Sequence, residues 1–254
     1  MAAEETINNN VNEDEDEGME MSFLDHLEEL RWRIIYSLIG LIVGAILCWI
    51  FIDFLVDNIL LIPAKNVGVK LQNLRPFGQL LLYMQIAIIG GVIVSLPNLF
   101  YQLWKFISPA LRKKERKYIS AIVAFSSFCF ILGIVFAYFL MIPFSLRFAA
   151  SFGSKTIENN FAIDEYFNII ISIMLAAGVV FELPMVSFFL SKLGILTPKF
   201  MRRFRKHSIV VIFILSALLT PGTDPVSQII LAVPLVLLYE ISILVSKFAQ
   251  KKKS

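Results

Sequence analysis

The sequence predicts an all-α protein that crosses a membrane six times with kinked helices, forms a concave face and keeps both termini in the cytoplasm. Three observations lead to this prediction. The 254 residues are 57% hydrophobic and only 17% charged, against roughly 25% charged in ordinary soluble domains. Several almost charge-free runs reach the length of about 18 residues that indicates a membrane span. Lysine and arginine gather in alternate connecting segments, as cytoplasmic loops require.

The chain divides into three predicted parts. Residues 1–21 are expected to form an acidic, disordered cytoplasmic tail, because residues 1–20 carry eight acidic side chains and no basic one. Residues 22–248 are the predicted six-span membrane domain. Residues 249–254 contain three consecutive lysines and are predicted to form a basic cytoplasmic tail.

Six apolar runs give the spans in order: residues 34–52, 80–100, 119–142, 166–191, 207–219 and 225–246. A full crossing needs about 20 residues at 1.5 Å each. The fifth run is too short for a bilayer of normal thickness, unless its flanks join it or the membrane thins locally.

The distribution of bases sets the predicted orientation. With the N-terminus inside, the inner segments hold 18 of the 23 lysines and arginines and the outer loops hold five, which places both termini in the cytoplasm. Five prolines lie within or at the ends of the spans: Pro97, Pro143, Pro184, Pro221 and Pro234. They predict curved helices around a concave face, although prolines that only end helices fit the pattern equally well.

The segment before the first span has an unusual charge pattern. Residues 22–32 contain three acids, a histidine and Arg31, where a membrane surface favours bases. The acids therefore suggest a cationic ligand. A purely local explanation stays open, because Glu29 with Arg33 and Glu28 with Arg31 have the spacing of helix-stabilising ion pairs, each worth about 0.3–0.5 kcal/mol.

The same segment has helical periodicity. Its apolar residues recur at helical spacing: Leu24, Leu27, Leu30 and Ile34. We expect a short helix that lies on the membrane before turning into the first span. His26 and Glu29 are three residues apart and share one face of this helix.

Glu182 is the only charge in the fourth predicted span. It lies ten residues before Lys192, or roughly 15 Å deep. A central acid costs about 3 kcal/mol on insertion scales, so such residues usually face a cavity, a partner helix or a water path. A neutral, hydrogen-bonded structural glutamate remains an alternative. For Thr220 and Gln228, beside the last outer turn, inter-helix hydrogen bonding is expected.

Motifs for covalent chemistry are missing from the sequence. It has no His-Glu-x-x-His pattern, no phosphate-binding loop and no G-x-S-x-G elbow. Cys48 and Cys129 lie in apolar runs and are expected to be buried thiols. We expect no enzyme activity, no cofactor, no metal and no nucleic-acid partner. The main alternative function is a proton- or cation-coupled secondary transporter that uses Glu182.

Four motifs resemble one known family. HLEELR at residues 26–31 is similar to the H-L-x-E-L-R pattern of the TatC family, the multispanning receptor subunit of the twin-arginine protein translocase. Residues 101–111, followed by Glu115, resemble its first cytoplasmic loop. FELP at residues 181–184 resembles its fourth-span motif, and residues 220–228 resemble its last outer turn. The resemblance runs in order through all six spans.

The resemblance implies a receptor for signal peptides that carry consecutive arginines. It implies export of folded proteins across the bacterial cytoplasmic (inner) membrane, driven by the proton-motive force. The implied partners are twin-arginine signal peptides, TatA- and TatB-type single-span subunits and membrane lipid, in homo- and hetero-oligomers.

The resemblance also implies roles for individual residues. Glu29 and Glu115 would bind the arginine pair, and Phe106 and its loop would help form the site. The predicted signal-peptide site is completed by His26, Arg31 and Pro109. Glu28 places a second acid at the variable position of the motif.

Other implied roles lie within the membrane and at its outer side. Glu182 would line the concave face, and Pro63 would belong to the first outer loop. Thr220 and Gln228 would lie near a partner-helix contact. The turn that contains them is one residue longer than in close relatives.

Overall fold

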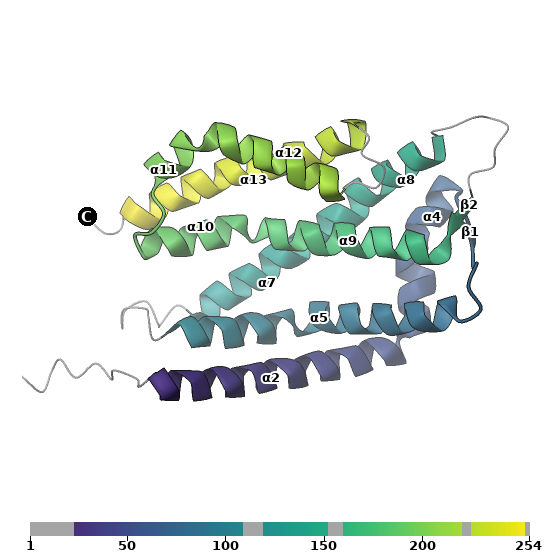
Figure 1. Cartoon of the computed structure of the whole chain (residues 1–254), viewed down its shortest axis with the longest axis horizontal. Helices are drawn as coiled ribbons and strands as arrows, with labels where there is room; N and C mark the ends of the chain where they lie inside the picture. The colour runs from purple at the N-terminus through teal and green to yellow at the C-terminus, as the bar shows by residue number, and fades with distance from the viewer. Residues whose placement is uncertain (1–22, 109–118, 152–159, 220–224, 252–254) are drawn as a thin grey trace, which may run out of the picture.

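The computed structural model describes residues 23–108, 119–151, 160–219 and 225–251. Long helices run back and forth between two ends of the molecule (Figure 1). The crossing segments are α2 (Phe23–Ile50), α5 (Gly78–Ile107), α7 (Ile119–Phe136) with η3 (Ala137–Met141) and α8 (Ile142–Ser151), α9 (Ile163–Phe181) with α10 (Leu183–Lys192), α12 (Arg205–Leu219) and α13 (Pro225–Lys251). The shorter elements are α3 (Ile52–Leu55), η1 (Val56–Leu60), α4 (Ile62–Val67), β1 (Lys70–Gln72), β2 (Asn160–Ala162) and α11 (Pro198–Arg203).

The predicted six-span fold is confirmed, with a short fifth span. Among the residues that the structure describes, five helical segments are long and apolar enough to cross a membrane. α12 has 15 residues, or about 22 Å, and lies beside α13. The start of α2 and the end of α13 lie at the same end of the molecule (Figure 1), as an even number of passes requires. The lysine and arginine count assigns this end to the cytoplasm.

The expectation of a separate surface helix before the first span is wrong. α2 is one continuous helix of 28 residues from Phe23 to Ile50. Residues 23–39 contain neither proline nor glycine, so nothing interrupts the backbone hydrogen bonds where the turn was expected. The acidic segment is therefore the first part of the spanning helix itself.

Prolines occupy two kinds of position. Pro97 and Pro234 lie inside α5 and α13, so these two do not merely end helices. Pro184 is in the first turn of α10, directly after the interruption that separates it from α9. Pro143 is the second residue of α8 and follows the π-helical segment η3. Pro221 lies outside the described residues.

A small parallel sheet at the outer end was not predicted. β1 pairs with β2, with Lys70 opposite Asn160 and Gln72 opposite Ala162. Arg75 and Asp164 form an ion pair beside the sheet at 3.3 Å. Strands of three residues are too short to give a periodic pattern in the sequence. The sheet links the segment after the first span to the start of the fourth.

Tyr166 anchors the outer end of the bundle. Its side chain is 1% exposed, and its hydroxyl donates to the carbonyl of Leu60 at 2.7 Å and accepts from the N–H of Ala64 at 3.2 Å. Tyr138 donates to the carbonyl of Ile59 at 2.7 Å. These bonds hold η1 and α4 against the third and fourth spans. Pro63, implied to belong to the first outer loop, is buried in α4.

Glycines allow α2 and α5 to pack at very short range. A Cβ atom at Gly91 would lie 2.5 Å from the backbone nitrogen of Ala45, and one at Gly44 would lie 2.6 Å from the carbonyl oxygen of Gly91. Small residues at membrane helix interfaces let backbones approach in this way. The contact fixes α2 along α5, so that the start of α2 lies beside the end of α5 (Figure 1).

Candidate functional site

The start of α2 and the end of α5 meet through two aromatic rings. The imidazole ring of His26 stacks on the phenyl ring of Phe106, with centroids 4.4 Å apart and planes inclined by 16°. The structure therefore brings together two residues that the sequence predicted for one site. They come from two separate motifs, so the motifs are neighbours in space at the cytoplasmic end.

Glu29 lies one turn further along α2 and is paired with Arg33. The Nε atom of Arg33 donates to Oε1 of Glu29 at 3.2 Å, and Nη2 of the same guanidinium bonds the same oxygen. The expected local ion pair is thus present. Both partners are largely buried, with side-chain exposures of 14% for Arg33 and 22% for Glu29.

A polar ladder continues from this ion pair into the interface between α2 and α5. Arg33 donates through Nη1 to Oε1 of Gln102 at 3.2 Å. Gln102 donates to Oδ1 of Asn98 at 3.4 Å, and Asn98 donates to the carbonyl of Tyr36 at 3.1 Å. Sequence reasoning missed these residues. The sequence pattern that could have revealed them is a pair of amide side chains four residues apart, Asn98 and Gln102, within a charge-free run.

The second carboxylate oxygen of Glu29, Oε2, is buried and has no hydrogen-bond partner among the described residues. A buried unpaired polar atom costs about 1–3 kcal/mol, and more when it is charged. Chemically, this carboxylate can accept further hydrogen bonds, and a guanidinium donates them in parallel pairs. It supplies a binding group for a cation at the cytoplasmic mouth of the bundle.

The other predicted residues of the signal-peptide site are placed differently. Arg31 and Glu28 are exposed and lie on the face of α2 opposite to His26, Glu29 and Arg33. Glu115 and Pro109 lie outside the described residues, so the convergence of two carboxylates stays a prediction.

Glu182 lies at the interruption between α9 and α10, where it precedes the first residue of α10. It is close to Ser126, Cys129 and the backbone of Phe130 on α7. Its Oε1 atom is buried and unpaired in the described part of the chain. The carboxyl group therefore faces a neighbouring helix within the bundle. Its predicted role at a concave face stays a prediction.

Gln228 forms the expected inter-helix hydrogen bond. Its amide on α13 donates to the carbonyl of Phe213 on α12 at 2.9 Å. This bond links the fifth span to the sixth. Thr220 lies outside the described residues, and the partner-helix contact proposed for both residues stays a prediction.

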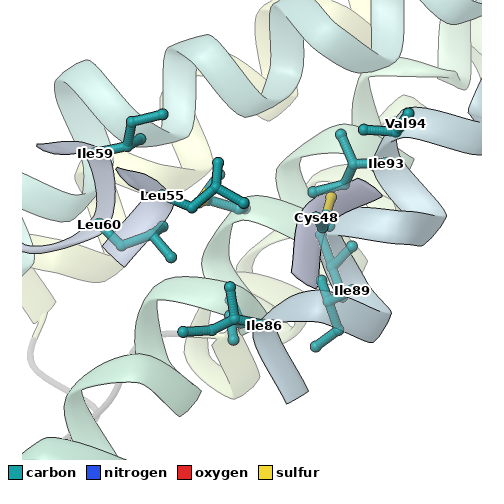
Figure 2. Close-up of a pocket in the computed structure, with 12 residues that line it drawn as sticks. Cys48, Leu55, Ile59, Leu60, Ile86, Ile89, Ile93 and Val94 are labelled. Atoms are coloured by element: carbon teal, nitrogen blue, oxygen red, sulfur yellow. The ribbon is translucent and has the colours of Figure 1, made fainter. Parts of the chain in front are cut away.

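An apolar pocket of about 170 Å³ lies toward the outer end of α2 and α5. Figure 2 shows Cys48 and Ile93 on one side of it and Ile59 on another. All lining residues are apolar, so the pocket can accept only apolar groups. Within the described ranges, no cluster of three or more histidine, cysteine or acidic side chains is arranged to hold a metal.

These features define a class: a multi-pass membrane protein whose cytoplasmic end presents a carboxylate that already holds one guanidinium. Comparison with known families identifies it more closely. The family described as "Sec-independent protein translocase protein (TatC)" matches residues 25–234. The chain belongs to the TatC family.

Relatives and solved structures agree with this assignment. The TatC protein of Carboxydothermus hydrogenoformans is 37% identical over 92% of this chain and 96% of the relative. That of Aquifex aeolicus is 34% identical over 92% of this chain and 98% of its own length. A crystal structure of the twin-arginine translocase receptor TatC superposes with a TM-score of 0.77 at 34% identity, covering 89% of this chain and 99% of that chain.

The comparisons confirm the resemblance seen in the sequence and the predicted fold. They do not support the alternative of a secondary transporter that uses Glu182, because these relatives are named as translocase proteins.

Proposed function

We propose that this chain is the signal-peptide receptor and core subunit of a twin-arginine translocase. It exports folded proteins across the bacterial cytoplasmic membrane with the proton-motive force and catalyses no covalent chemistry. The observation that supports this most is Glu29, a largely buried carboxylate at the cytoplasmic mouth of α2, one oxygen of which has no hydrogen-bond partner among the described residues, in a chain of the TatC family.

Arginine recognition follows from the chemistry of carboxylates. A guanidinium fork makes two parallel hydrogen bonds to a carboxylate, which an ammonium group cannot copy. Glu29 binds one arginine of the signal and Glu115 binds the other. The ring pair of His26 and Phe106 braces the start of α2, which carries Glu29, against the end of α5, which precedes the segment that contains Glu115. Surrounding bases repel a cationic peptide only weakly beyond about 10 Å at physiological salt.

The remainder of the signal and the partners bind elsewhere on the molecule. The apolar stretch of the signal inserts along the concave face near Glu182. TatA- and TatB-type single-span subunits contact the region of Thr220 and Gln228. The subunit works in homo- and hetero-oligomers surrounded by membrane lipid.

Binding of a labelled twin-arginine signal peptide to the purified protein in lipid nanodiscs tests the proposal. Glu29→Gln and Glu115→Gln should each weaken binding about tenfold or more, because a hydrogen bond to a charged group contributes about 1.5–3 kcal/mol. Glu28→Gln is the matched control, since it removes an exposed neighbouring acid and should leave the affinity unchanged. Unchanged affinity for the signal in both test variants would contradict the site assignment.

A further inference from the structure

We propose that Arg33 is an internal competitor of the signal peptide. It occupies the carboxylate of Glu29 when no signal is bound, and it moves fully onto Gln102 when a signal arginine takes its place. This inference rests on the proposed function and adds to it a switch that sets the affinity for the signal.

The geometry of the ion pair supports competition for the same carboxylate. Arg33 places both Nε and Nη2 on Oε1 of Glu29. The other oxygen, Oε2, is buried. A second guanidinium needs both oxygens to make its parallel pair of hydrogen bonds. It therefore cannot bind Glu29 in that way until Arg33 leaves Oε1 and the carboxylate turns toward the peptide.

A partner for the displaced guanidinium is already in position. Nη1 of Arg33 donates to Oε1 of Gln102 at 3.2 Å while the ion pair is intact. Gln102 is in turn held by Asn98, which belongs to the same helix, α5. Arg33 thus keeps a hydrogen-bond acceptor when it releases Glu29, so release does not leave a buried cation without any partner.

The affinity follows from what the incoming group must replace. With Arg33 in place, the signal meets a neutral pair and not a free anion. A signal arginine replaces the hydrogen bonds of one guanidinium with those of another. A lysine ammonium is a point charge without the planar fork, so it competes less well with Arg33 than an arginine does. Because Arg33 must leave Glu29 whichever peptide binds, it lowers the affinity for every cationic peptide by the same factor, and the preference for arginine comes from the planar fork itself.

The test compares the affinities of a twin-arginine and a twin-lysine signal peptide for the full-length protein in nanodiscs. Arg33→Gln should bind both the twin-arginine and the twin-lysine peptide about tenfold more tightly, so the ratio of the two affinities stays the same. Lys199→Gln is the control: it removes one exposed positive charge at the same end of the molecule, away from Glu29, and should change neither affinity.

If Arg33→Gln does not fold, Arg33→Lys tests the competitor role instead, because it keeps the positive charge but loses the planar guanidinium. It should bind the twin-arginine peptide more tightly than the wild type. Weaker or unchanged binding in the folded variants would overturn the competitor role and make Arg33 a residue that positions Glu29. If the wild type itself binds both peptides equally, the proposed function fails as well, and the two failures are thereby distinguished.

Discussion

The ring of His26 lies against the ring of Phe106, with centroids 4.4 Å apart, and this contact joins the start of α2 to the end of α5. Glu29 lies one turn beyond His26, and α5 ends at Ile107, before the part of the chain that contains Glu115. The stack therefore holds the start of α2 beside the end of α5.

Replacing Phe106 should weaken signal binding. An aromatic pair contributes about 0.5–1.5 kcal/mol beyond its buried area, so Phe106→Ala should reduce affinity by about twofold to tenfold, while Phe106→Tyr keeps most of it. Phe128→Ala, which truncates an exposed ring on α7, serves as the control. Equal affinities for Phe106→Ala and the wild type, measured with the labelled signal peptide, would show that the stack has no part in the site.

Tyr166→Phe should destabilise the protein without touching the cytoplasmic site. The change removes the donor to Leu60 and the acceptor for Ala64 and leaves both backbone groups buried. The expected loss is about 1–2 kcal/mol. Thermal unfolding of purified protein in detergent measures it, and Tyr36→Phe, at a half-exposed tyrosine, should unfold like the wild type. A Tyr166→Phe protein as stable as the wild type would contradict the anchoring role.

Gly91→Ala should push α2 and α5 apart. The added carbon would lie 2.5–2.9 Å from the backbone nitrogen, Cα and Cβ of Ala45, and these atoms cannot move without shifting the helix backbone. Overpacking of this kind costs about 1–3 kcal/mol, and the shift should also misalign Glu29 with the end of α5 and lower signal affinity. The control is Ala124→Val, on the exposed side of α7. Normal stability and affinity in Gly91→Ala would mean that the helix contact does not set the site.

Glu182→Gln separates the receptor from the transporter alternative. An amide can accept the hydrogen bonds available near Ser126 but carries no charge and moves no proton. A receptor should retain most of its export activity with this change, and proteoliposomes containing the wild-type chain alone should show no flux of small solutes. Solute flux that Glu182→Gln abolishes would favour the transporter.

Hydropathy and charge predicted the architecture well, because length, apolar content and base distribution act locally along the chain. The Glu29–Arg33 pair was predicted for the same reason, since its spacing lies within one helix. The links from Arg33 to Gln102 and from Asn98 to Tyr36 could not be predicted. They depend on the register of α2 against α5, which the close approach at Gly44 and Gly91 determines.

The most direct test of whether Glu29 recognises the signal is a double-mutant cycle between Glu29 and one arginine of the signal. Affinities are measured for wild-type and Glu29→Gln protein, each with the native signal and with that arginine replaced by glutamine. If the two groups pair, the second change costs little after the first, and the coupling should exceed about 1 kcal/mol. A cycle through Glu28→Gln should be additive. If the losses of binding free energy from Glu29→Gln and from the arginine substitution are additive within about 0.5 kcal/mol, direct recognition of the signal by Glu29 is contradicted.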